Sequence, residues 1–148
     1  MKYFPFIFFL ASIVCIKVQA TESPNFIFIL TDDQGWTSLS SAIDPDFPKA
    51  KSDYHITPNM DALLQMGVSF TNGYAAAPVC APSRYSIQFG KTAARVKRTI
   101  ARGPNYADHD QVGLAQYLKM INPEYLCAHL GKWHIDADPA RYGYDLHD

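Results

Sequence analysis

The feature that most constrains the fold is an unbroken apolar run at residues 26–30, which lies between Pro24 and the polar sequence Thr31-Asp32-Asp33. A short continuous run of this kind suits a strand that is buried on both faces, as in a parallel sheet. A strand of this type requires other elements to cover it on both sides. The run therefore favours a layered α/β protein.

The rest of the chain supplies helices and further short strands. Thr57 and Pro58 suit the cap and first turn of a helix that ends at Gly67. Ordered along the chain, the patterns predict a helix from 58 to 67, a strand at 68–70, a loop at 75–82, a helix at 83–89 ending at Gly90, a helix at 110–120 and a strand at 125–130. This order predicts an α/β fold with a mostly parallel sheet flanked by helices.

Two polar clusters follow predicted strands, where α/β sheets bind their ligands. Asp32 and Asp33 are adjacent carboxylates, which favour a nearby cation, and hard divalent cations prefer oxygen ligands. The alternative is a polar turn. Lys132 and His134 would point the same way in an extended segment, where they could hold an anion and move a proton. The alternative is two surface residues.

Cys80 stands in the sequence "CAPSR", just before the predicted helix at 83–89. A helix start favours anions, and one turn of helix would bring Arg84 back toward Cys80. Cys80 is therefore either a nucleophile beside an anion-binding arginine or a free loop cysteine. Its spacing from Arg84 differs from the Cys-x5-Arg of a tyrosine phosphatase. A bridge to Cys127 is disfavoured, because Cys127 lies in an apolar run typical of a buried strand.

Four motifs together resemble the type I sulfatases, which have an alkaline-phosphatase-like core. "CAPSR" is similar to their Cys-x-Pro-Ser-Arg signature, and "PNFIFILTDDQGW" resembles their opening strand and metal-binding aspartates. "ITPNMDALLQMGVSFTNGYAAAPVCAPSR" and "GKWH" resemble two further stretches in the same order. The resemblance covers the chain from about residue 23 to its end. It departs at Ile87, Gln88 and Phe89, where the family usually has Leu-Leu-Thr.

This resemblance implies a sulfuric ester hydrolase. Cys80 would be oxidised by a maturation enzyme to formylglycine, whose hydrate attacks a sugar or aryl sulfate ester and later expels sulfate. The resemblance also implies that Asp32, Asp33 and the group made from Cys80 bind a divalent ion, calcium in the family. Arg84 would steady the formylglycine, Lys132 would bind sulfate, and His134 would be the base. A related metal-dependent phosphatase or phosphodiesterase is the alternative enzyme, but its nucleophile is Ser or Thr.

Residues 1–20 resemble a secretory signal, with Lys2, an apolar stretch and the small-residue site Val18-Gln19-Ala20. We therefore expect a secretory-pathway protein that is secreted, periplasmic or lysosomal. A formal net charge of −1 predicts no nucleic-acid partner. Residues 21–148 would form the amino-terminal part of a sulfatase catalytic domain. A further hypothesis is a truncated, inactive fragment, since residues 21–148 alone would leave apolar faces and a strand edge uncovered.

We predict that the signal is removed after Ala20, because this residue completes the small-residue cleavage site. Mass spectrometry of the secreted chain should then find Thr21 as the first residue. A mature chain that still begins with Met1, or that carries a lipid on Cys15, would contradict the prediction.

Overall fold

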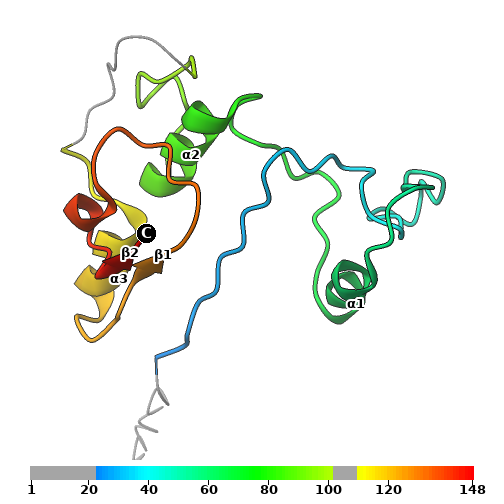
Figure 1. The fold of residues 1–148 in the computed structure, drawn as a ribbon, viewed down its shortest axis with the longest axis horizontal. Coiled ribbons are helices and arrows are strands. Elements are labelled where there is room, and N and C mark those ends of the chain that lie inside the picture. The colour runs from blue at the N-terminus through cyan, green and yellow to red at the C-terminus, as the bar shows by residue number, and fades with distance from the viewer. Residues whose placement is uncertain (1–22, 102–109) are drawn as a thin grey trace, which may run out of the picture.

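The computed structural model describes residues 23–101 and 110–148, so the predicted signal at 1–20 lies outside the described residues. Helix α2, helix α3, a short 3-10 helix and a small sheet gather in one body, while α1 lies apart from them (Figure 1). The elements in chain order are α1 Pro58–Met66, α2 Cys80–Phe89, α3 Leu114–Ile121, β1 Ala128–His129, η1 Pro139–Tyr142 and β2 Leu146–His147.

The sheet in the described residues is a parallel pair. β1 pairs with β2 in the register Ala128↔Leu146 and His129↔His147, and the connection between them contains η1. The predicted strand at 125–130 is therefore confirmed only at residues 128–129, and the sequence patterns did not predict β2. The Asp145 carboxylate extends the contact between the two strands, because it accepts a hydrogen bond from the Cys127 backbone amide at 2.8 Å.

The strands predicted at 26–30 and 68–70 are wrong for the described structure, because neither segment pairs with a strand. The side chains at 26–30 are exposed, from 42% at Leu30 to 88% at Ile27. The physical reason is the absence, within the described residues, of a strand bonded to either edge of this segment. Without such a neighbour, an apolar segment of this length has nothing to bury its two faces.

The segment at 23–32 nevertheless runs beside residues 122–132. At one end, the Asn122 side chain donates to Ser23 Oγ at 2.8 Å, and the Tyr125 hydroxyl donates to the Pro24 carbonyl at 2.7 Å. At the other end, Lys132 Nζ donates to Asp32 Oδ2 at 2.5 Å. The sequence separations of the three pairs are 99, 101 and 100 residues. The two segments are thus parallel and keep a nearly constant alignment.

Helix α1 matches the predicted helix and ends at Gly67, whose amide bonds to the Leu63 carbonyl at 3.0 Å. Thr57 does not cap it through its side chain. The Thr57 hydroxyl instead donates to Asp61 Oδ1 at 3.1 Å and accepts from the Ser40 amide at 2.8 Å. These bonds tie the preceding loop to α1 and replace the expected cap.

The other two helices differ from prediction at their starts. α2 begins at Cys80, so residues 80–82 belong to the helix rather than to the predicted loop. Pro82 is tolerated there because a first-turn amide has no partner within the helix. Gly90 ends α2 as predicted, with a left-handed φ of 60°. α3 begins at Leu114, because Gln116 accepts a hydrogen bond from the Gly113 amide at 2.8 Å and fixes the start there.

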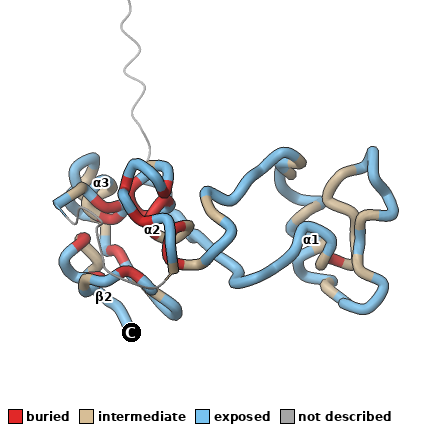
Figure 2. Tube along the Cα trace, turned by 90° about the horizontal axis from the view of Figure 1, so that it is seen from above, coloured by how far each residue is buried: buried red, intermediate tan, exposed pale blue. Residues whose placement is uncertain are grey.

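The main core packs α2 against the segment that follows β1. Its buried members are Tyr85, Phe89, Val96, Ile135 and Tyr142. The rings of Phe89 and Tyr142 meet edge to face with centroids 5.2 Å apart, a favourable aromatic geometry. Buried residues gather around α2 and α3, whereas the region of α1 is mostly exposed (Figure 2). The stable part of the described chain is therefore the part that carries Cys80.

The expectations for the two cysteines can be compared with this fold. Cys80 and Cys127 are both free, and Cys127 is buried as expected. None of the helices in residues 23–101 and 110–148 combines the length and apolar character that a membrane span requires.

We predict that Phe89→Ala lowers the free energy of unfolding by about 3–5 kcal/mol, the usual cost of removing a buried phenylalanine ring. Phe89 is 7% exposed, whereas Phe70 is 80% exposed. Phe70→Ala is therefore the matched control and should change stability by no more than about 0.5 kcal/mol. Denaturant unfolding measures both, and equal losses in the two variants would contradict the described core.

Candidate active site

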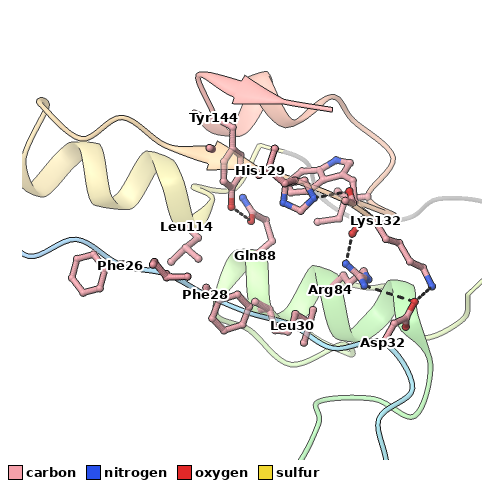
Figure 3. A pocket seen from close by; sticks show the side chains of 17 residues that line it. Phe26, Phe28, Leu30, Asp32, Arg84, Gln88, Leu114, His129, Lys132 and Tyr144 are labelled. Carbon is pink, nitrogen blue, oxygen red and sulfur yellow. Dashed lines mark hydrogen bonds and ion pairs between the residues drawn. The ribbon is translucent and has the colours of Figure 1, made fainter. Parts of the chain in front are cut away.

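Three segments that are distant in sequence bring charged side chains together beside α2. Asp32 follows the extended segment, Arg84 lies on α2, and Lys132 follows β1 (Figure 3). Lys132 Nζ lies 2.5 Å from Asp32 Oδ2, and Arg84 Nη2 lies 4.0 Å from the same oxygen. Arg84 also donates through Nη1 to the backbone carbonyl of Lys132. The structure therefore places these three predicted site residues in one cluster.

The electrostatics extend the cluster to two more predicted residues. The hydrogen bond from Lys132 lowers the pKa of Asp32, and the positive charges of Lys132, Arg84 and His134 act in the same direction. The same bond raises the pKa of Lys132, and a negative charge at Cys80 raises it further. Cys80 and His134 are thus close enough to act on the Asp32–Lys132 pair.

Cys80 is held at the first turn of α2. It is half-buried and free, and Val79 before it is extended. The Ser83 hydroxyl donates to the Ala77 carbonyl at 2.6 Å, which secures the turn that leads into the helix. Arg84 lies one helical turn beyond Cys80, and its side chain is only 11% exposed. Cys80 and Arg84 therefore lie one turn apart on α2, and the pairing of their side chains stays a prediction.

Two predicted site residues have left-handed backbones. Asp33 and His134 both have φ values of 55°, and within the described residues Lys97 is the only other non-glycine residue with a positive φ. Such conformations are uncommon and cluster where the surrounding structure imposes them. Positive φ angles at Gly131 and His134 flank Lys132 and Trp133. The charges of Lys132 and His134 both act on Asp32, and the expectation that the two side chains point the same way stays a prediction.

The structure does not assemble a metal centre from the part of the chain that it describes. No group of three or more histidine, cysteine or acidic side chains there is placed to hold a metal ion. Asp32 is engaged by Lys132 and Arg84, while Asp33 is exposed and bonds to none of the described residues. The assignment of Asp32, Asp33 and Cys80 as metal ligands therefore stays a prediction.

A cavity of about 590 Å³ adjoins the charged cluster. Asp32, Arg84 and Lys132 line it together with apolar side chains from the 26–30 segment, α2 and α3 (Figure 3). The cavity occupies the space between the extended segment and the residues around β1. The cluster is therefore open to ligands at the end of the sheet, where α/β folds bind them.

Sequence reasoning missed the partners of two side chains in α2. Gln88 is buried, and its Oε1 accepts a hydrogen bond from the Tyr144 hydroxyl at 3.0 Å. Phe89 is buried against Tyr142. The aromatic sequence near residues 142–144 was the available signal, but nothing in the sequence indicated which helix it would meet. The core thus covers both residues that depart from the usual sulfatase signature, although Gln88 Nε2 is buried without a partner among the described residues.

Comparison with known proteins places this chain in a family. The family model for Sulfatase matches residues 24–147. The chain is 30% identical to human N-acetylgalactosamine-6-sulfatase over 139 residues, which cover 85% of this chain and 25% of that protein. It is 33% identical to the ulvan-active sulfatase of Formosa agariphila over 127 residues, which cover 82% of this chain and 22% of that protein. It is 32% identical to human arylsulfatase G over 117 residues, covering 77% and 20% of the two chains.

The chain therefore belongs to the sulfatase family, and this confirms the resemblance found in the sequence. The family has an alkaline-phosphatase-like α/β fold, with which the three helices and the parallel strand pair in the described residues are consistent. The chain spans about a quarter of the length of the curated relatives that it matches.

We predict that Lys132→Gln raises the pKa of Asp32 toward the ordinary aspartate value of 3.8, because the hydrogen bond from the lysine is the largest cause of its lowering. Lys119→Gln is the matched control. It should leave Asp32 unchanged and raise the pKa of Asp145, which Lys119 lowers in the same way. Carboxyl-carbon NMR during an acid titration measures both groups.

The sign of the stability effect follows from the lowered pKa. Ionised Asp32 stabilises the folded state above its ordinary pKa, and this contribution is lost as the pH falls through the lower folded value. Lys132→Gln should therefore flatten the acid limb of the stability curve. An Asp32 titration that is identical in Lys132→Gln and in the unaltered protein would show that the ion pair does not persist in solution.

Proposed function

We propose that this chain carries part of the active site of a sulfatase that hydrolyses sulfate esters through a formylglycine made from Cys80. One observation carries the proposal. Asp32, Arg84 and Lys132 converge from three separate segments beside the helix that begins with Cys80, in a chain that matches the sulfatase family. The related metal-dependent phosphatases and phosphodiesterases use Ser or Thr where this chain has Cys80.

The cations of the cluster suit a sulfate group. Arg84 and Lys132 have side-chain nitrogens within 4.0 Å of one carboxylate oxygen, so this position already accommodates an anionic oxygen. A guanidinium and an ammonium group together can bind the oxygens of a sulfate ester. We assign Lys132 to bind sulfate, and Arg84 to steady the group formed from Cys80 and its developing charge.

His134 is the proposed proton carrier. Imidazole exchanges protons near neutral pH, and His134 acts electrostatically on Asp32 within the same cluster. The left-handed backbone of His134 places it at the bend that follows Lys132. We propose that it removes a proton from the hydroxyl that expels sulfate at the end of the reaction.

Asp32 and Asp33 would hold a divalent cation together with the group made from Cys80. Their donor chemistry fits a hard ion, because both side chains are carboxylates with oxygen ligands. We propose calcium, which takes six to eight oxygen ligands, so these residues account for part of its ligand set. When bound, the ion would supply Lewis-acid stabilisation of developing negative charge.

The remaining parts of the proposal concern partners and location. The substrate would be a sugar or aryl sulfate ester, and a formylglycine-generating enzyme would be required for maturation. Residues 1–20 support a route through the secretory pathway, to a secreted, periplasmic or lysosomal destination. The whole sheet would be the mostly parallel, helix-flanked sheet of the family, of which β1 and β2 represent a parallel pair.

The test of this function begins with Cys80. When the chain is expressed with a formylglycine-generating enzyme, the Cys80 peptide should lose the mass difference between a thiol and an aldehyde. Cys127 is the internal control, because it lacks the Pro and Arg that follow Cys80. Alkylation after denaturation should label Cys127 fully and Cys80 only in its unconverted fraction. Uniform alkylation of both cysteines would contradict the proposal.

Activity provides the second arm of the test. In the longest protein that contains this chain, Cys80→Ala should abolish hydrolysis of an aryl sulfate, because no nucleophile remains. Lys119→Gln, at an ion pair outside the cluster, should leave the rate within about twofold. Equal rates in the unaltered and Cys80→Ala proteins would overturn the sulfatase assignment.

A further inference from the structure

Two consecutive residues of α2 form hydrogen bonds with the two ends of the loop at 132–136. Arg84 donates to the carbonyl of Lys132. Tyr85 makes two bonds to Asp136: its hydroxyl donates to Asp136 Oδ2 at 2.6 Å and accepts from the Asp136 backbone amide at 3.0 Å. Between these points lies His134, with its left-handed backbone. We call the paired bonds between Tyr85 and Asp136 the clasp.

The clasp involves a buried tyrosine, so its hydrogen bonds help to fix the position of the loop. Tyr85 is fully buried in the core and Ile135, next to Asp136, is 7% exposed. Burial and the bond to Asp136 raise the pKa of Tyr85 to about 12, so its hydroxyl keeps its proton at neutral pH. A buried hydroxyl without partners would be costly, so the bonds to Asp136 favour one position of the loop.

Arg98 reinforces the clasp from a third segment. Its guanidinium lies 5.7 Å from the centroid of the Tyr85 ring, and its Nη2 lies 4.0 Å from Asp136 Oδ1. Arg98 is buried, whereas Asp136 is partly exposed. The Arg98 guanidinium thus faces both partners of the clasp. The three side chains therefore form one network behind the loop.

We propose that Tyr85 and Asp136 are positioning residues, which hold the Lys132–His134 loop in its bent conformation beside Cys80 and Arg84. The inference takes the roles of Lys132 and His134 from the proposed function. The conformation of the loop is argued independently, from its hydrogen bonds and backbone angles. A left-handed histidine persists where its surroundings impose it. That constraint comes from hydrogen bonds on both sides of His134. Arg84 bonds to Lys132 before it, and Tyr85 bonds to Asp136 after it.

Four variants of the full chain separate positioning from general stability. Tyr85→Phe keeps the buried ring and removes both bonds of the clasp. Asp136→Ala removes one bond, and Asp136→Asn retains an oxygen that can accept from Tyr85. Tyr144→Phe is the matched control, because it removes a tyrosine hydroxyl bonded to α2 through Gln88 but keeps the ring that packs against Trp133 of the loop.

The readout is the nuclear Overhauser effect between the amide and α protons of His134, which is strong only when φ is positive. Unfolding free energies are measured alongside it. We expect Tyr85→Phe to weaken this signal several-fold, Asp136→Ala to weaken it less, and Asp136→Asn and Tyr144→Phe to preserve it. If Tyr85→Phe fails to fold, the proposal is tested by comparing the His134 signal of Asp136→Ala with that of Asp136→Asn.

Several results would overturn the proposal. These are an undiminished signal in Tyr85→Phe, equal losses in Tyr85→Phe and Tyr144→Phe, identical behaviour of the two Asp136 variants, or an unaltered chain without the signal. The readout involves no sulfate ester or metal, so it separates the two proposals. An inactive protein with the expected NMR series would refute only the function, and an active protein with an unchanged series would refute only the positioning.

Discussion

The packing of α2 against residues 135–142 is the contact on which the described site depends. Tyr85 and Phe89 bury one side of the helix against Ile135 and Tyr142. This contact sets the helix direction, and with it the places of Cys80 at the first turn and of Arg84 one turn later. Because the burial of two aromatic rings is worth several kcal/mol, it outweighs any single polar contact of the site.

The charged contacts of the site have a different energetic character. Lys132 and Asp32 are each almost half exposed, so their attraction is screened by water and salt. Such a pair aligns the two segments and adds little to global stability. The bonds at the far end, from Asn122 and Tyr125, give the same alignment independently. The positions of the charged side chains are thus set by the packing of the segments that carry them. The charges themselves contribute little to folding.

The departures from the usual family signature show how a local change is absorbed. Gln88 places a polar side chain in a buried position, where its oxygen is satisfied by Tyr144. Phe89 adds a large ring, which packs against Tyr142. Both partners lie in the segment around η1, more than fifty residues away in sequence. The helix that carries Cys80 therefore keeps a well-packed side despite its changed sequence.

The sequence by itself determined the family and the local structural signals. Proline and glycine marked α1 and the end of α2, and the four motifs indicated the sulfatase family, because these features depend on residue type and short spacing. Only the tertiary structure decided the pairing of β1 with β2, the unpaired state of residues 26–30 and the bonding of Tyr85 to Asp136. The strand pairing joins residues 18 positions apart, and Tyr85 and Asp136 are 51 positions apart. The pattern of apolar and polar residues indicates which side chains of a segment can be buried or hydrogen-bonded. It does not indicate which distant segment supplies the partner.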